Sequence, residues 1–195
     1  MPEPIRLAIL ASGSGSNAVS ILRHFQASTV VDVAFVGCNR SPEKAGIYDR
    51  TKSFGMETEY FSNEDLIEGR LLNTLHERGI HWVALAGFLA RIPEDFVRAF
   101  AGRMLNVHPS LLPKFGGRGM YGMNVHKAVI EAGESESGMT VHWVTEEYDE
   151  GAVVFQAACE VREGDTPEQL ADRVLELEHT YYARTIAACM ATVAS

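Results

Sequence analysis

The chain has 195 residues, of which 46% are hydrophobic and 22% charged, and its formal net charge is −9. This composition suits one folded domain with a substantial core, and it excludes a general nucleic-acid surface, because such surfaces depend on Lys and Arg. The three cysteines are widely spaced and form no CxxC motif, which is typical of a reducing compartment. The sequence shows no secretory signal and no apolar run of about 18 residues. We therefore expect a cytoplasmic protein without a membrane span.

Short apolar runs alternate with helical patterns along the first half of the chain. Strands are expected at residues 5–11, 30–37, 82–86 and 104–107. Helix start signals lie between them, at Ser41-Pro42 and at Asn63, which precedes an amphipathic run over 64–78. Almost continuously apolar strands separated by helices predict a doubly wound, mostly parallel α/β sheet.

The last third of the chain has a different pattern. The apolar runs 139–144 and 153–161 are joined by the polar turn 146–151, which is short enough for an antiparallel hairpin. Thr166 to Gln169 combine a cap, a first-turn proline and a capping-box partner, so a helix is expected from there to about residue 191. We therefore expect a single domain over 1–195, with a Rossmann-like, mostly parallel sheet and an antiparallel C-terminal hairpin.

A glycine-serine loop, residues 12–17, follows the first predicted strand, and a helix is expected to begin near Ala18. The backbone of such a loop can approach a ligand closely, and the helix N-terminus favours an anion, for which phosphate is the natural choice. The alternative is a plain turn in which Ser or Asn caps the helix. The loop lacks the GK[ST] of a Walker loop, and Ala18 replaces the third glycine of a dinucleotide loop, so a dinucleotide is less favoured.

Asn106 and His108 fall on one face of the strand predicted at 104–107, because side chains alternate along a strand. The carboxyl end of an inner strand is where open α/β sheets hold their ligands. A carboxamide can hold a carbonyl oxygen, and an imidazole can move a proton near neutral pH. His142 lies within another strand and is expected to be structural. The histidines do not show the HExxH spacing, so the sequence does not predict a metal site.

The polar segment 145–151 supplies several carboxylates. Most are expected to be solvated, but one of them could turn inward and orient an imidazole, and the spacing does not indicate which. The sequence contains neither a GxSxG elbow nor a cysteine-protease signature, so a covalent intermediate is not predicted. The residues alone thus predict a phosphate-binding loop, an Asn/His pair and a carboxylate partner. A non-catalytic nucleotide-binding module could use the same loop.

Several segments between residues 5 and 182 resemble the folate-dependent phosphoribosylglycinamide formyltransferases. The matching segments read ILASGSGSN, LAGFLARIP, GRMLNVHPSLLPKF, HWVTEEYDEG and the EH of LELEH. The NxHPSLLP element, followed after about 40 residues by a strand and an acidic turn, is the most specific of them. The resemblance implies the formyltransferase fold, with a phosphate-binding half at 1–100 and a folate-binding and catalytic half at 101–195.

The resemblance also implies a role for each matched residue. Asn106, His108 and Asp149 match the catalytic triad of the family. Substrate binding is implied for Gly15, Ser16 and Asn17 (phosphate), Pro109 (amine) and Glu178 (ribose hydroxyls). The walls of the folate pocket are matched by Leu89, Ala90, Arg91, Ile92, Val144, Thr145, Glu146, Glu147 and Tyr148.

The activity implied by the resemblance is transfer of a formyl group from 10-formyltetrahydrofolate to the amine of glycinamide ribonucleotide, in purine biosynthesis and without a metal. Asn106 and His108 would stabilise the oxyanion formed when the amine attacks, while Asp149 would hold His108 charged and oriented and assist proton transfer. The implied partners are these small molecules, with no nucleic acid and no membrane. A monomer or homodimer is compatible with the family.

The chain departs from the family pattern at Glu64, where an arginine is usual, and in GFLARIP, where the arginine is displaced by one position to Arg91. Arg91 and Arg118 are the candidates to replace the missing contact with the folate tail. Segment 115–122 contains four glycines and predicts a mobile flap. Methionyl-tRNA formyltransferase and formyltetrahydrofolate hydrolase are the alternatives within the superfamily. Both are disfavoured, because each is expected to carry an additional domain.

Overall fold

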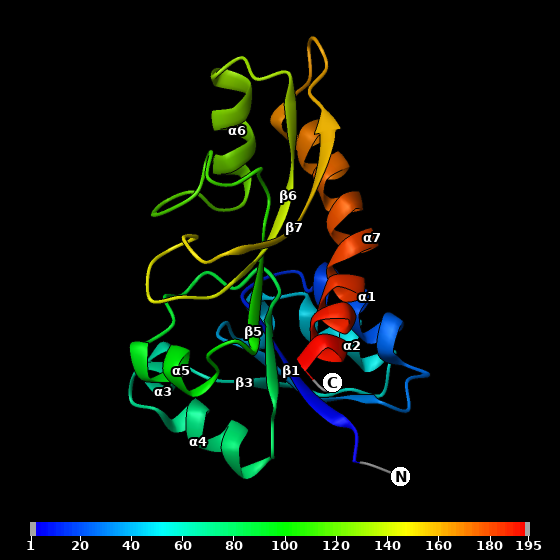
Figure 1. The fold of residues 1–195 in the computed structure, drawn as a ribbon, viewed down its shortest axis with the longest axis vertical. Helices are drawn as coiled ribbons and strands as arrows, with labels where there is room; N and C mark the ends of the chain where they lie inside the picture. The colour runs from blue at the N-terminus through cyan, green and yellow to red at the C-terminus, as the bar shows by residue number, and fades with distance from the viewer. Residues whose placement is uncertain (1–2, 194–195) are drawn as a thin grey trace. The chain divides into compact units, whose positions relative to one another are not determined.

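A computed structural model describes residues 3–193 of the chain (Figure 1). The structure divides into two compact units between Leu105 and Asn106. The single domain with halves at 1–100 and 101–195, which the resemblance implies, stays a prediction. Within residues 3–193, none of the helices is both long enough and apolar enough to cross a membrane.

The first unit is built on parallel strands in the order β3-β2-β1-β4. Their bounds are Ile5–Ala11 for β1, Val31–Cys38 for β2, Thr58–Tyr60 for β3 and Trp82–Leu85 for β4. In β4 every residue is buried, and in β1 the last five are, as expected for parallel strands covered on both faces. The sequence did not predict β3, because it is short and polar.

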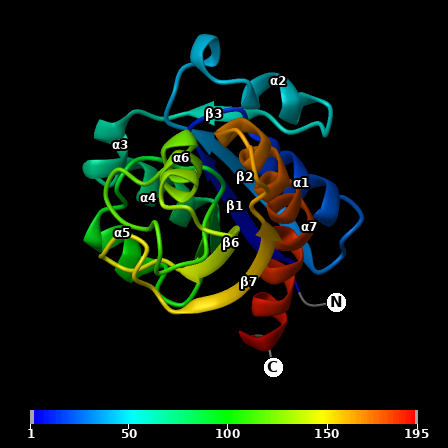
Figure 2. The same ribbon diagram turned by 90° about the horizontal axis from the view of Figure 1, so that it is seen from above.

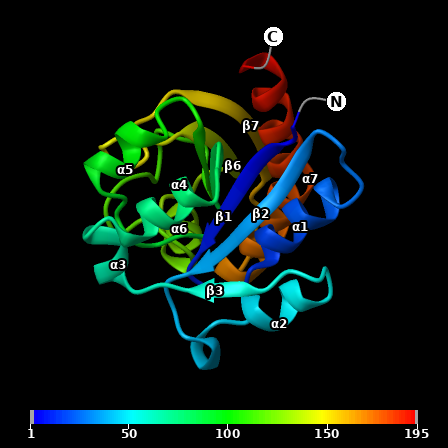
Figure 3. The ribbon, with the colours of Figure 1, turned by 90° about the horizontal axis from the view of Figure 1, so that it is seen from below.

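Helices flank both sides of these strands. Their bounds are Ser16–Phe25 for α1, Ile47–Lys52 for α2, Asn63–Ile67 for α3, Arg70–Glu77 for α4 and Glu94–Ala99 for α5. Figure 3 shows α1 and α2 on one side of the β1–β2 pair and α3 and α4 on the other. The buried residues of α1 include Ala18, Ile21, Leu22 and Phe25, whose spacing gives the helix one apolar face.

Two helix predictions in this unit need correction. The helix predicted over 64–78 is two short helices, because Gly69 adopts the left-handed conformation (φ 77°) between them. The cap of α3 is Ser62 and not Asn63. The Ser62 hydroxyl accepts from the Asp65 N–H at 3.1 Å, and the Asp65 carboxylate accepts from the Ser62 N–H at 2.7 Å. Ser41-Pro42 opens only a single 3₁₀ turn, η1, over Pro42–Lys44.

The second unit contains an antiparallel hairpin covered by a long helix. Its elements are most of β5 (Met104–His108), α6 (Met123–Glu131), β6 (Glu136–Trp143), β7 (Val153–Glu160) and α7 (Pro167–Val193). Figures 1 and 2 show α7 lying along β6 and β7. The predicted capping box of α7 is confirmed, since the Thr166 N–H donates to the Gln169 side chain at 2.9 Å and the Gln169 N–H donates to the Thr166 hydroxyl at 3.3 Å.

Candidate active site

The glycine-serine loop of the first unit leads directly into α1. The helix begins at Ser16, two residues before the predicted start, and its N-cap is Gly15 in the left-handed conformation. No side chain caps this helix, so the interpretation of the loop as a Ser- or Asn-capped turn is not supported. Asn17 is buried and Ser16 is half-buried. The helix N-terminus therefore retains the positive end of the dipole that favours an anion.

Ser12, at the base of this loop, is buried, and its hydroxyl is hydrogen-bonded to two segments far apart in the sequence. Its hydroxyl donates to the Asn39 side chain at 2.7 Å and accepts from the backbone N–H of Leu89 at 2.9 Å. Asn39 in turn donates to the Asn63 side chain at 2.8 Å. Because β1 and β4 are neighbouring parallel strands, the loops at their carboxyl ends lie together. No pattern in the sequence indicates this role for Ser12.

Gly15 offers a direct test of the loop. A Cβ at this position would lie 2.5 Å from Ile47 Cγ1, and the φ of 77° is strained for any other residue. We expect Gly15→Ala to lower the free energy of unfolding by about 1–3 kcal/mol and to weaken binding of a phosphate-bearing ligand. Gly13→Ala is the matched control, because nothing lies within 4 Å of a Cβ there. Chemical denaturation and ligand titration would measure both effects, and equal losses in the two variants would contradict the prediction.

The second unit brings together the residues predicted at 106, 108 and 149. His108 is buried, and its Nδ1 lies 3.5 Å from Asp149 Oδ2. Its Nε2 lies 2.8 Å from the carbonyl oxygen of Phe115. Asp149 Oδ2 also accepts from the N–H of Gly117 at 2.9 Å. The acidic turn therefore supplies a single half-buried carboxylate, which the spacing could not identify.

His142 connects Asn106 with Asp149. Its Nδ1 lies 2.9 Å from the Trp143 carbonyl, which can only accept, so Nδ1 carries a hydrogen. In the neutral ring Nε2 is then an acceptor, and Asn106 Nδ2 donates to it at 3.1 Å. The second hydrogen of this amide is left for a ligand oxygen. Nε2 also lies 3.5 Å from Asp149 Oδ1. The expectation that His142 only supports the strand is thus too narrow, because the sequence does not reveal that its strand passes beside Asn106.

Burial and hydrogen bonding set the charges in this cluster. Burial lowers the pKa of His108 below its ordinary value, although Asp149 and the Phe115 carbonyl act in the opposite direction. Burial would raise the pKa of Asp149, but its contacts with His142 and His108 and the hydrogen bond from the Gly117 N–H outweigh the effect of burial, so this pKa is lowered. At pH 7 the cluster therefore contains a carboxylate beside a neutral imidazole. The expected charged His108 is not supported.

A buried polar network holds the turn that follows His108. The Thr140 hydroxyl donates to the Ser110 carbonyl at 2.6 Å and accepts from the Leu112 N–H at 3.0 Å. The Gln156 side chain donates to the same hydroxyl at 2.9 Å and to the Leu112 carbonyl at 3.0 Å. Thr140 and Gln156 lie opposite each other in the β6–β7 register. The hairpin therefore fixes the backbone around Pro109, which is half-buried.

The other predicted residues lie in loops or on α7. Leu89 and Arg91 are exposed, Ala90 is half-buried and Ile92 is buried, all in the loop after β4. Val144 is half-buried and Thr145 to Tyr148 are exposed in the loop after β6. Glu178 is 7% exposed on α7. Arg118, the second candidate for the folate tail, is exposed, as is Glu64.

Almost the whole chain is similar to known proteins. The model of the family described as formyl transferase matches residues 5–186. The chain belongs to the formyl transferase family. A chloroplastic phosphoribosylglycinamide formyltransferase of Arabidopsis thaliana is 40% identical over 192 residues, which cover 96% of this chain and 66% of that protein. The trifunctional purine biosynthetic protein adenosine-3 of Gallus gallus is 38% identical over 98% of this chain and 18% of its own length.

Solved structures agree with this assignment to the formyl transferases. Glycinamide ribonucleotide transformylase 1 from Symbiobacterium toebii has a TM-score of 0.86 and 33% identity, with 95% of this chain and 87% of that chain covered. Phosphoribosylglycinamide formyltransferase from Brucella melitensis has a TM-score of 0.83 and 34% identity, with 94% of each chain covered. The resemblance and the predicted fold class are thus confirmed. The chain spans 66% of the length of the Arabidopsis thaliana protein and 60% of the length of a second plant relative, a chloroplastic phosphoribosylglycinamide formyltransferase of Vigna unguiculata.

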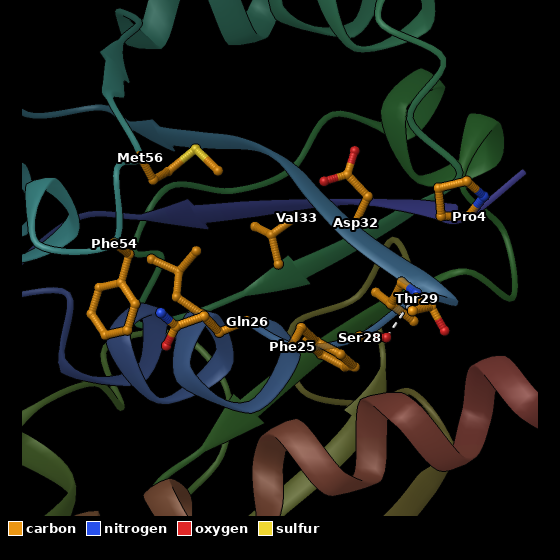
Figure 4. Close-up of a pocket in the computed structure, with 11 residues that line it drawn as sticks. Pro4, Phe25, Gln26, Ser28, Thr29, Asp32, Val33, Phe54 and Met56 are labelled. Atoms are coloured by element: carbon orange, nitrogen blue, oxygen red, sulfur yellow. Dashed lines mark hydrogen bonds between the residues drawn. The ribbon is translucent and has the colours of Figure 1, made fainter.

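The first unit of this formyl transferase also contains a cavity away from the predicted site residues. A cavity of about 430 Å³ in the first unit is lined by residues of α1, β2 and the loops beside them, including Phe25, Val33 and Met56 (Figure 4). It contains none of the predicted site residues. Among residues 3–193, no group of three or more His, Cys, Asp or Glu side chains is arranged to hold a metal ion.

Two buried histidines are expected to make the melting temperature of this formyl transferase depend on pH. Burial lowers the pKa of both His108 and His126 below 6.5. A histidine with a lowered folded-state pKa stabilises the fold above its unfolded-state pKa, and this contribution is lost as the pH falls through the interval between the two values. We therefore expect the melting temperature to decrease as the pH falls below about 6.5. Thermal unfolding between pH 7.5 and 5.5 would measure this, and His126→Gln should reduce the slope. A melting temperature that stays constant or rises over this interval would contradict the prediction.

Proposed function

We propose that this protein transfers the formyl group of 10-formyltetrahydrofolate to the amine of glycinamide ribonucleotide, as a step of de novo purine biosynthesis. The observation that carries the proposal is the convergence of Asn106, His108 and Asp149 in the second unit. It is supported by the family match and by the names of the relatives. Phosphate binding is assigned to Gly15, Ser16 and Asn17 at the start of α1.

The chemistry follows from the charges in the cluster. The substrate amine attacks the formyl carbon, and the developing oxyanion accepts from the amide hydrogen of Asn106 that does not contact His142. Asp149 is a carboxylate at neutral pH and can draw a proton from the attacking amine, directly or through water. His108, neutral and buried beside it, accepts that proton from Asp149 and then donates it to the leaving nitrogen as the bond between this nitrogen and the formyl carbon breaks. Each of these groups lies in the second unit.

The remaining assignments complete the proposal. Pro109 would hold the amine through its backbone, and Glu178 would contact the ribose hydroxyls. Folate binding stays a prediction for Leu89, Ala90, Arg91 and Ile92 of the first unit, and separately for residues 144–148 of the second. A metal-free reaction, a cytoplasmic location and a monomeric or homodimeric state stay predictions, and both plant relatives are described as chloroplastic.

One assay separates this proposal from its alternatives. Purified protein is incubated with 10-formyltetrahydrofolate, with and without glycinamide ribonucleotide, and tetrahydrofolate, formate and formylated product are measured. We expect turnover only when the amine is present, with one formyl group transferred for each folate consumed. Formate release that does not depend on the amine would indicate a hydrolase. Binding of the nucleotide without turnover would indicate a non-catalytic module.

A further inference from the structure

The segment Phe115–Gly117 touches both halves of the proposed proton-transfer pair through its backbone. The Phe115 carbonyl oxygen lies 2.8 Å from His108 Nε2, and the Gly117 N–H donates to Asp149 Oδ2 at 2.9 Å. A carbonyl oxygen can only accept a hydrogen bond, so the hydrogen of this contact belongs to Nε2. In a neutral ring, Nδ1 is then without a hydrogen. Three consecutive residues thus orient the imidazole and the carboxylate together.

The backbone of this segment is specialised for these contacts. Phe115 has a φ of 55°, in the left-handed region that residues other than glycine rarely adopt. At Gly116, a Cβ would lie 2.5 Å from Leu112 Cδ2 and 3.4 Å from Asp149 Cβ. The buried Ser110 hydroxyl donates to the Lys114 carbonyl at 2.7 Å, which fixes the turn just before Phe115. Unusual backbone conformations of this kind persist only where the surrounding structure holds them.

We propose that Phe115 is a positioning residue: its left-handed backbone directs its carbonyl to His108 Nε2, fixes the neutral imidazole as the Nε2–H tautomer, and leaves Nδ1 as the atom that exchanges the proton. Nδ1 faces Asp149 Oδ2 at 3.5 Å. The proton lost by the attacking amine as the new C–N bond forms would be taken up by Asp149 or Nδ1. It would be returned to the leaving nitrogen when the bond between that nitrogen and the formyl carbon breaks.

This inference deepens the proposed function and rests on it for the reaction, whereas the tautomer belongs to the protein alone. It also limits the flap predicted at 115–122, because the first and third residues of that segment, Phe115 and Gly117, are hydrogen-bonded to the catalytic pair. The titratable groups that act on the His108 ring are Asp149, His142 and His126. Any pH titration of His108 has to be interpreted with these three groups present.

The experiment compares Phe115→Val with Phe115→Asn. Both variants lose the aromatic ring and have side chains of similar size, but Asn adopts the left-handed region readily and a β-branched residue does not. Long-range ¹⁵N–¹H correlation spectra of ¹⁵N-histidine-labelled protein report the tautomer, and His108→Gln assigns the signals. At pH 7.5 we expect the Nε2–H pattern for His108 in the wild type and in Phe115→Asn, and a tautomer mixture in Phe115→Val.

Kinetics provide the second measurement. We expect Phe115→Val to lower kcat about 10-fold or more with little change in KM for the amine, and Phe115→Asn to stay within about 3-fold of the wild type. An Nδ1–H pattern in the wild type would overturn the inference even if Phe115→Val failed to fold. Equal kcat losses in the two folded variants would overturn it as well. An Nε2–H pattern in a wild type without formyl transfer would refute the proposed function and leave the tautomer assignment standing.

Discussion

Asp149→Asn is expected to lower kcat by about 10²–10⁴-fold, the range that general acid–base groups contribute. Asn retains an oxygen for the Gly117 N–H and tolerates the left-handed backbone of residue 149, whose φ is 56°. It removes the negative charge beside His108 and His142 and replaces one accepting oxygen by an NH₂ group. The variant should therefore fold and bind substrates, because the loss falls on proton transfer and not on the shape of the turn.

Steady-state kinetics with both substrates varied would measure this effect, and circular dichroism would confirm the fold. Glu150→Gln is the matched control, because it removes a charge from the adjacent exposed position and should leave kcat almost unchanged. A tenfold or smaller loss in Asp149→Asn would show that the carboxylate is not the proton acceptor of the reaction.

His108→Ala is the second large expected effect, with kcat lowered by about 10²–10⁴-fold and substrate affinity largely retained. The substitution removes the imidazole that lies between Asp149 and the Phe115 carbonyl. Because these groups act as a unit, the double variant His108→Ala/Asp149→Asn should be little worse than the poorer single variant.

Single-turnover kinetics separate the chemical step from product release, and His24→Ala on the exposed side of α1 is the control. Multiplicative losses in the double variant would mean that the two residues act in independent steps. A loss in His108→Ala that appears entirely as a raised KM would assign the ring to binding and not to proton transfer.

Short apolar runs were sufficient to predict the main strands, and a capping pattern was sufficient to predict the start of α7, because each depends on local sequence. Every residue of Ile5–Ala11 except Arg6 is apolar. The helix start at Thr166 has its capping partner, Gln169, three residues further along the chain. The break between α3 and α4 was missed, because an isolated glycine inside a helical pattern is often tolerated. Only the observed left-handed φ of Gly69 shows that the helix ends there.

The candidate site could be predicted in part for the same reason. Asn106 and His108 share a strand face, which the alternation along β5 makes visible in the sequence. The partnership of His142 with Asn106 joins residues 36 positions apart, and that of Ser12 with Leu89 joins residues 77 apart. Such pairs depend on which strands become neighbours, and no local pattern encodes that. The choice of Asp149 among the carboxylates of its turn came from the family resemblance alone.

The contact between Ser12 and Leu89 has a consequence for ligand selection. The N–H of residue 89 is already donated to the Ser12 hydroxyl, so in the proposed folate contact it would not serve as a donor to the ligand. A lone pair of the ligand placed against this N–H would be desolvated without compensation. Under the proposal, the polarity of this position would help to discriminate between flat ring systems of equal size, which shape alone does not do.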